Sequence, residues 1–381
     1  MKLQTYTYRD NWNRKFDVNL NVDKSLIIVF TSANKSIVEQ PLTELVSFFS
    51  KATIIGASGA GQIAQDELLE NSMVVAVLTF RSARIKSVSE RLLSNRESFE
   101  NGVSISNKLR EDDLKAIFLL SDGLITNGSK LTKGIASIYG NTIVVTGGLA
   151  GDNHEFKNTY VIVDGKLTQG YLSAVGLYGE HIHVGHGSGG GWDNLGVKRL
   201  VTKSKDNVLY ELDSQPALDI YRRYLGEKSS ELPSIGVHFP IKLSNTFTSK
   251  EEESNIRTIL GIDEQNKTIT FAGDIDEGSY ASLMRGNNDR LIDGATLAAE
   301  KVNLDGHGNE DILSIAISCV GRKFLLKQQT EEELEATLEV LPQKTMQIGF
   351  YAYGEIAPIS SGICDLHNET MTLTVIWEDN A

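Results

Sequence analysis

The feature that most constrains the fold is the alternation, in the first half of the chain, of short apolar runs with segments of helical spacing. Largely apolar runs occur at 26–31, 52–56, 72–80, 115–120 and 141–146, and their lengths are typical of buried strands. Apolar residues recur at helical spacing over 36–50, and helices are also expected near 98–110 and 128–138. This alternation predicts an α/β domain whose sheet faces are covered by helices.

The second half carries the same kinds of element in another order. Strands are expected at 254–262, 267–273, 311–319, 345–353 and 370–377, and helices at 213–226, 290–303 and 330–340. Pro216 suits the first turn of a helix, and Thr330 and Glu333 have the spacing of a capping box. We therefore predict a mixed α+β fold of two packed domains, 25–226 and 227–378, each with a mixed sheet covered by helices.

The charge and cysteine content exclude several classes of function. A formal net charge of −13 argues against binding to nucleic acid or to an anionic membrane surface, since both require clustered Lys and Arg. No apolar run approaches the ~20 residues of a spanning helix, and the amino terminus lacks the apolar core of a secretory signal. Two cysteines form no disulfide framework and fit a reducing compartment. We expect a cytoplasmic protein.

The densest group of candidate functional side chains lies between two strand-like runs near the carboxyl end. The segment GFYAYGEIAPISSGICDLHNET spans residues 349–370 and contains Glu355, Cys364, His367 and Asn368. Rigid flanking strands would aim these polar groups at a small-molecule site. Cys364 and His367 also allow a nucleophilic dyad, although such dyads are normally assembled from distant positions.

Two turn motifs offer further candidate ligand-binding residues. In TGGLAGD (146–152), Gly147 and Gly148 permit close backbone approach at a strand end, beside Asp152, where α/β sheets tend to hold ligands. A sharp structural turn explains the glycines equally well. In SCVGR (318–322), which includes Cys319, the Arg322 guanidinium can clamp a carboxylate or a haem propionate, or can pair with an internal acid.

These motifs together resemble those of the FIST family of intracellular ligand-sensing proteins. The resemblance rests on GFY-x-YGEI-x-P followed by CDLHNET, on TGGLAGD, and on SCVGR, and covers most of residues 25–375. It adds Arg257, which stands where the family has an arginine. The glycine loop GASGAG (56–61) lacks the Cys, hydroxyl and Glu residues common there, so only its backbone role carries over.

The resemblance also raises haem as a possible cofactor, because some members of the family are haem-binding sensors of nitric oxide. His181 and His183 share one face of an expected strand and are the candidate axial ligands. The other histidines, at 154, 186, 238, 307 and 367, are equally available. We expect no metal site, because no further zinc ligand stands at a recognised spacing from them.

The sequence thus predicts a sensory protein rather than an enzyme. Its small-molecule ligand is either haem or a polar metabolite such as an amino acid, and an enzyme with a Cys364/His367 site is the third alternative. Because both predicted domains are matched to ligand sensing, the output is expected to act on a separate partner. The resemblance implies a sensor histidine kinase or a cyclic-dinucleotide enzyme, and an oligomer is compatible with the sequence.

Overall fold

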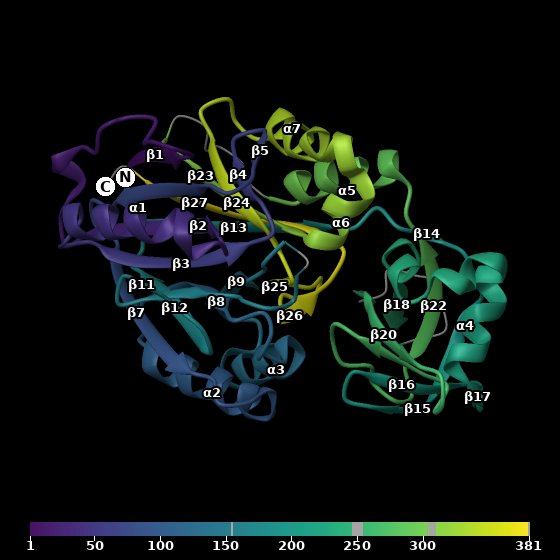
Figure 1. Cartoon of the computed structure of the whole chain (residues 1–381). Helices are drawn as coiled ribbons and strands as arrows, with labels where there is room; N and C mark the ends of the chain where they lie inside the picture. Colours follow the sequence, from purple (N-terminus) through teal and green to yellow (C-terminus); the bar gives the residue numbers. More distant parts are fainter. Residues whose placement is uncertain (154, 246–253, 303, 305–309, 380–381) are drawn as a thin grey trace.

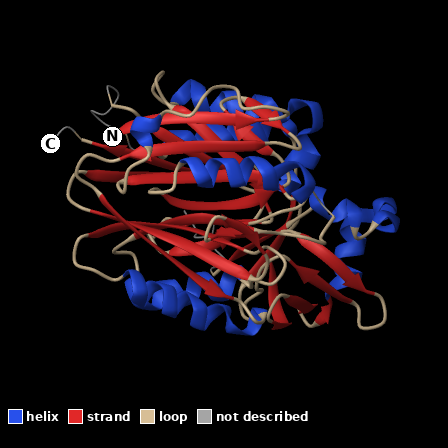
Figure 2. Ribbon diagram, turned by 60° about the vertical axis from the view of Figure 1, so that its left-hand side comes forward, coloured by secondary structure: helices blue, strands red, loops and turns tan. Residues whose placement is uncertain are grey.

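The computed structural model consists of a body built from three six-stranded sheets and a smaller lobe at one side (Figure 1). It describes residues 1–153, 155–245, 254–302, 304 and 310–379. We use "lobe" for residues 193–285 and "body" for the described residues of 1–189 and 288–379. Helices lie on the outside of the stacked sheets (Figure 2). In the described part of the chain, every helix is too short or too polar to cross a membrane.

The first sheet is formed entirely by the amino-terminal half and has the order β1-β6-β2-β3-β10-β11. The parallel pair β2–β3 is joined through α1 (Lys35–Phe48). Leu26, Ile28 and Phe30 of β2 face the interior of the body, while Ile27 and Val29 face α1. Burial on both faces explains the wholly apolar sequence of this strand. The strands are β1 (Lys2–Tyr8), β2 (Ser25–Ser32), β3 (Thr53–Gly59), β6 (Met73–Thr79), β10 (Val161–Val163) and β11 (Lys166–Thr168).

The second sheet, of order β26-β25-β9-β8-β12-β7, combines strands from both halves of the chain. The parallel pair β8–β9 is joined through α3 (Gly128–Tyr139), which packs with α2 (Ser98–Leu109) on the outer face. The strands are β7 (Arg84–Arg91), β8 (Leu114–Ser121), β9 (Val144–Leu149), β12 (Tyr171–Tyr178), β25 (Gly354–Pro358) and β26 (Cys364–His367).

The third sheet, of order β13-β27-β23-β24-β4-β5, is likewise shared between the two halves. The parallel pair β23–β24 is joined through α6 (Val320–Leu326) and α7 (Thr330–Val340), and α5 (Asn288–Glu300) lies beside α7. The strands are β4 (Gln62–Ala64), β5 (Glu67–Leu69), β13 (Ile182–Gly189), β23 (Leu313–Cys319), β24 (Met346–Ala352) and β27 (Met371–Glu378).

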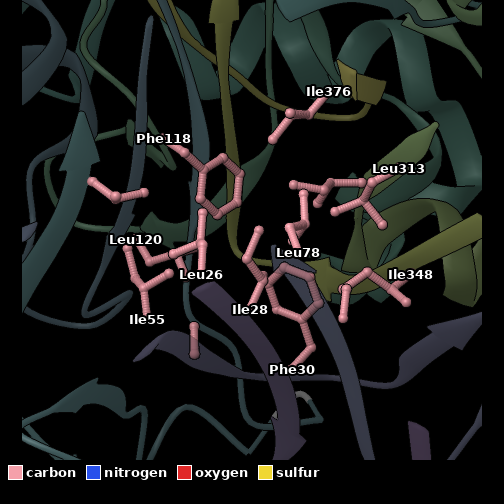
Figure 3. Close-up of a cluster of buried hydrophobic side chains, with 14 of the residues drawn as sticks. Leu26, Ile28, Phe30, Ile55, Leu78, Phe118, Leu120, Leu313, Ile348 and Ile376 are labelled. Atoms are coloured by element: carbon pink, nitrogen blue, oxygen red, sulfur yellow. The ribbon is translucent and has the colours of Figure 1, made fainter. Parts of the chain in front are cut away.

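The inner faces of the three sheets enclose one apolar core. Figure 3 shows Leu26 of the first sheet beside Phe118 of the second sheet, and Phe30 of the first sheet near Ile348 of the third. Phe30 stacks on Phe350 with a centroid separation of 4.6 Å. Because each sheet buries its inner face against the other two, the body folds as one unit.

The lobe has its own sheet and its own core. Its nine described strands are ordered β19-β18-β22-β15-β16-β21-β20, with β14 beside β22 and β17 beside β16, and α4 (Ala217–Leu225) packs against them. The strands are β14 (Asp193–Asn194), β15 (Arg199–Lys205), β16 (Val208–Leu212), β17 (Gln215–Pro216), β18 (Ile241–Ser244), β19 (Ser254–Arg257), β20 (Ile259–Asp263), β21 (Thr268–Phe271) and β22 (Tyr280–Arg285).

The predicted fold class is confirmed, since the chain is mixed α+β with helices covering mixed sheets. The polar stretch 226–233 lies inside the lobe, because strands on both sides of it share the lobe's sheet. The helix expected at 213–226 begins only at Ala217, since Asp213 and Ser214 have positive φ and form a turn. The capping-box interpretation of Thr330 and Glu333 is wrong, because Glu333 is buried and binds Arg322.

Candidate functional site

A cavity of about 670 Å³ lies between the body and the lobe, and we call it the interlobe cavity. Its volume is within the range of small-molecule sites, which occur preferentially at such junctions. Its walls come from three parts of the sequence that are far apart. They include, from the body, Asn95, Arg96, Thr126, Asn127, Lys130, Leu149, Phe156, Cys319, Val320, Gly321 and Tyr353; and, from the lobe, Asp206, Asn207, Ser234, Thr258, Ile259, Phe271, Ala272 and Asp274.

The body's side of the cavity is formed where parallel strands end. Leu149 is the last residue of β9 and Cys319 the last of β23, and α6 follows β23 directly. In α/β sheets, the carboxyl ends of parallel strands are where loops and helix starts leave room for a ligand. The cavity therefore has the position in the fold that is typical of a binding site.

The floor of the cavity contains a buried carboxylate directly behind its lining. The Oγ1 of Thr258 in the lobe donates to Oε1 of Glu369 in the body at 2.8 Å, and both Thr258 and Gly321 line the cavity. A Cβ at Gly321 would lie 2.3 Å from Oε1 of Glu369, so only glycine admits the carboxylate here. Glu369 is 0% exposed.

Burial governs the ionisation of the two acids beneath this floor. Burial raises the pKa of Glu369 to about 7, against the opposing effects of the Thr258 hydrogen bond and the Arg322 charge. Burial also raises the pKa of Glu355 well above its ordinary value, although Thr370 donates two hydrogen bonds to its Oε2. Both acids therefore hold protons at a pH where exposed carboxyl groups are ionised.

Charged and amide groups of both signs lie on the cavity's flanks. Lys130 of α3 donates to Asp206 of the lobe at 2.7 Å, and this contact raises the lysine's pKa. Asn127 Nδ2 donates to Asp274 Oδ1 at 2.9 Å, so the same helix start contacts the lobe twice. Arg96 is exposed and makes no ion pair with another described residue. The flanks thus combine two cations, two acids and an amide.

An aromatic wall on the body side is fixed by Asp152. The Asp152 carboxylate accepts the backbone N–H groups of Phe156, Lys157 and Asn158, and also the hydroxyl of Tyr353. Phe156 stacks on Tyr353 with a centroid separation of 4.7 Å, and both rings line the cavity. Asp152 therefore lies behind the cavity and orders one of its walls.

Of the other sequence-predicted residues near this region, Cys319 lines the cavity and Arg257 supports it. Arg257 is buried and donates to the backbone carbonyls of Asp274, Ile256 and Leu366, which ties the lobe to β26. Gly147 and Gly148 lie within β9, where a Cβ at Gly147 would come 1.7 Å from the Leu119 carbonyl oxygen. Their lack of side chains permits close strand packing.

Arg322 lies in a buried ion pair and is not itself one of the residues that line the cavity. Its Nε and Nη2 donate to Oε2 of Glu333 at 2.9 and 2.7 Å, and neither side chain is exposed. Its remaining bonds go to the carbonyl oxygens of Gly190 and Leu291. Four of its five N–H groups thus donate to protein groups, so Arg322 makes the internal ion pair that the sequence offered as the alternative to a ligand clamp.

The residues of the carboxyl-terminal strip occupy different environments. Cys364 belongs to the apolar cluster under α2 and α3, and burial raises its pKa. His367 stands three residues along the same strand, so alternation directs the two side chains to opposite faces. His367 Nε2 lies 3.0 Å from the Ala357 carbonyl oxygen, and Asn368 donates to the His367 carbonyl.

The candidate haem ligands lie at the start of β13, remote from the lobe, with His183 inside the strand and His181 directly before it. His181 is exposed, whereas His183 contacts Asp379 at 2.6 Å and stacks on Trp377. Neither lines the interlobe cavity, and the described lining residues include no histidine. His154 and His307 lie outside the described residues. The described cavity residues therefore do not supply the axial imidazole on which the haem expectation rests.

Sequence reasoning missed most of the cavity's polar residues. Lys130, Asp206 and Thr258 lie in segments without a distinctive motif, and they meet only because the lobe folds back onto the body. Glu369 stands inside the strip 349–370 and was signalled only by that context. An acid between an amide and a threonine carries no sign of burial in a single sequence.

Comparison with protein families matches nearly the whole chain. The FIST N domain model matches residues 25–215, and the FIST C domain model matches residues 217–358. A similar protein, an uncharacterized protein of Methanocaldococcus jannaschii, is 22% identical over 402 residues, covering 95% of this chain and 75% of the relative. Among solved structures, a cyanuric acid hydrolase from A. caulinodans covers 93% of this chain and 90% of its own, with 9% identity and a TM-score of 0.36.

Proposed function

Since the chain belongs to the FIST family, we propose that it is a sensory protein whose small ligand binds in the interlobe cavity. FIST domains are associated with signal transduction and with the sensing of small ligands. The observation that carries the proposal is the composition of the cavity walls, which come from the body on one side and the lobe on the other.

The signal would arise from a change in how the lobe sits on the body. A ligand shifts an equilibrium only if it binds one arrangement better than another. An occupant of this cavity contacts both parts, so it favours the arrangement in which they are close. The polar links it would reinforce are those from Lys130 to Asp206 and from Thr258 to Glu369.

The lining favours a small polar metabolite, such as an amino acid, as the ligand. Arg96 and Lys130 can meet a carboxylate, Asp206 and Asp274 can meet a cationic group, and Phe271 and Tyr353 offer apolar area. Haem is the competing ligand, and a histidine that held it would have to come from beyond the described lining. We propose binding rather than catalysis, because Cys364 and His367 point to opposite faces of β26.

The proposal is tested by measuring ligand-dependent thermal unfolding of the purified chain. A library of amino acids, organic acids, nucleosides and haem is screened, because a ligand selective for the folded state raises the unfolding midpoint. The absorption spectrum of the protein as purified is recorded first, since bound haem gives a Soret band that shifts with nitric oxide. If no metabolite stabilises the protein and haem is not taken up stoichiometrically, the proposal is wrong.

Two variants connect a stabilising compound with the cavity. Ala272→Phe adds a ring to the cavity lining and should abolish the shift. Ala33→Phe makes the same change at a half-buried alanine that packs against the apolar cluster between the first sheet and α1, and should leave the shift intact. The proposed partner, a sensor histidine kinase or a cyclic-dinucleotide enzyme, is then assayed with and without the identified ligand.

A further inference from the structure

The floor of the interlobe cavity presents a hydroxyl whose hydrogen is already engaged. Thr258 Oγ1 donates to Glu369 Oε1 at 2.8 Å, so what remains of this hydroxyl is its acceptor lone pairs. A carboxylate acceptor polarises the hydroxyl and strengthens it as an acceptor for the next donor. Thr258 itself lines the cavity. At this point of the floor, a ligand can therefore bind Thr258 only by donating a hydrogen bond to it.

Three buried oxygen atoms beneath this floor lack a donor among the described residues. They are Oε2 of Glu369, Oε1 of Glu355 and Oδ1 of Asn368. They belong to side chains of β25 and of the turn that joins β26 to β27, and the two glutamate oxygens are acceptors when their carboxyl groups are ionised. Buried polar atoms are nearly always paired in folded proteins, so such a group points to a missing donor.

The neighbouring protein cations are already engaged elsewhere. The guanidinium of Arg322 donates to Glu333 and to two backbone carbonyls. Arg257 donates to the carbonyls of Asp274, Ile256 and Leu366. Within the described part of the chain, neither arginine donates a hydrogen bond to Glu355 or Glu369. The floor is thus rich in acceptors and poor in donors.

From these observations we infer that the ligand of the interlobe cavity carries a protonated amine, which donates to the Thr258 hydroxyl above the Glu369 carboxylate. The inference rests on the proposed function and names the chemical class of its ligand. An ammonium group has three donors and a positive charge, so it can donate to the Thr258 hydroxyl, and its charge favours the ionised form of Glu369. Because residue 321 is a glycine, the Glu369 carboxylate lies close to the cavity surface, where its charge can attract a cationic ligand.

A metal ion would be another way to satisfy these oxygens. Within the described ranges, however, no group of three or more His, Cys, Asp or Glu side chains is arranged to hold one. A water molecule is the remaining occupant. It would satisfy single oxygens without selecting a charged ligand, and the experiment distinguishes it from an amine.

The test is ligand binding to the full chain by thermal unfolding and calorimetry with matched probes. L-Leucine, L-lysine, putrescine and spermidine are each compared with the N-acetylated form. We expect at least one free amine to bind, and acetylation to weaken that binding at least tenfold. Glu369→Gln should weaken the same probe by a similar factor, whereas Glu335→Gln, which makes the identical change on the exposed face of α7, should not.

Unfolding without ligand shows whether Glu369→Gln has folded. If it has not, Thr258→Val removes the hydroxyl while leaving the carboxylate in place, and should also weaken the amine tenfold. Equal binding of acetylated and free probes, or full affinity in the folded variants, overturns the inference. A second panel of dicarboxylates and sugars distinguishes failure of the amine inference from failure of the proposed function. If only compounds of this second panel bind, and Ala272→Phe abolishes their binding, the amine inference is wrong but the sensory proposal stands. If no compound of either panel binds, both are wrong.

Discussion

The hydroxyl of Thr258 lies 2.8 Å from the carboxylate of Glu369, and this hydrogen bond joins the lobe to the body at the floor of the cavity. The bond is made by a fully buried acid that has a second oxygen without a described partner. Such an acid influences both ligand selection and stability, because its ionised form is poorly solvated in the folded chain.

The first prediction concerns pH and Glu369. Burial raises its pKa to about 7 from its ordinary value of 4.5, so the folded chain keeps a proton that the unfolded chain loses between these values. The free energy of unfolding contributed by this group therefore falls as pH rises from about 4.5 to 7. We expect Glu369→Gln to be more stable than the parent at pH 8, by up to about 3 kcal/mol, and nearly equal at pH 4.5. Urea unfolding at both pH values measures this difference, and parallel pH profiles would contradict it.

The second prediction concerns the buried pair of Arg322 and Glu333. Tyr351 and Ser318 also donate to Glu333, so either single substitution strands a buried charge together with its partners. We expect Arg322→Met to lower the free energy of unfolding by about 3–5 kcal/mol, and Arg322→Met combined with Glu333→Leu to recover much of that loss. Denaturant titration provides the measurement. If Arg322→Met were as stable as the parent, loss of the ion pair would not leave a costly unpaired charge at Glu333.

The apolar runs predicted most strands of the body because those strands are buried on both faces. β2 is the clearest case, since Leu26 and Ile28 face the core while Ile27 and Val29 face α1. β7 (Arg84–Arg91) was missed because it is an edge strand with a mostly polar, partly exposed sequence. The sharing of sheets between the two halves could not be predicted, because periodicity within one segment carries no information about its partner strand.

The candidate site could be predicted only in part, because a motif within one segment does not show which distant residues it contacts. The sequence predicts ligand-binding residues in the strip 349–370 and the turn 318–322, and of these Cys319 lines the cavity. The sequence leaves open whether Arg322 clamps a ligand or pairs with an internal acid, and its guanidinium pairs with Glu333 eleven residues away, across the α6–α7 turn. That pairing also explains why Glu333 forms no capping box. Contacts between the lobe and the body, such as Lys130 with Asp206, depend on the tertiary fold alone.

The third prediction uses three glycines that differ in their surroundings. Gly191 precedes the lobe with φ +78°, and a Cβ there would lie 1.8 Å from the Arg290 carbonyl oxygen. Gly278 has φ +86° with open space around it, and Gly261 is also open, without a left-handed φ. We expect alanine to cost about 2–5 kcal/mol at Gly191, about 1 kcal/mol at Gly278, and within about 0.5 kcal/mol at Gly261. Thermal unfolding ranks the variants, and a neutral Gly191→Ala would show that the entry to the lobe adjusts freely.

The fourth prediction uses the two cysteines as reporters of lobe movement. Cys319 lines the interlobe cavity, whereas Cys364 is buried in the cluster beneath α2 and α3. Burial raises the pKa of both thiols, so both should react slowly with iodoacetamide in the closed fold. Local opening requires less free energy than global unfolding, and opening of the lobe exposes only Cys319.

We therefore expect Cys319 to be alkylated at pH 8 at least tenfold faster than Cys364, and a ligand of the cavity to slow only the Cys319 reaction. Mass spectrometry of proteolytic fragments assigns each rate, and Cys319→Ala and Cys364→Ala confirm the assignment. Equal rates for both thiols would mean that the lobe separates from the body only when the whole chain unfolds. In that case, the movement on which the sensory proposal depends would not take place.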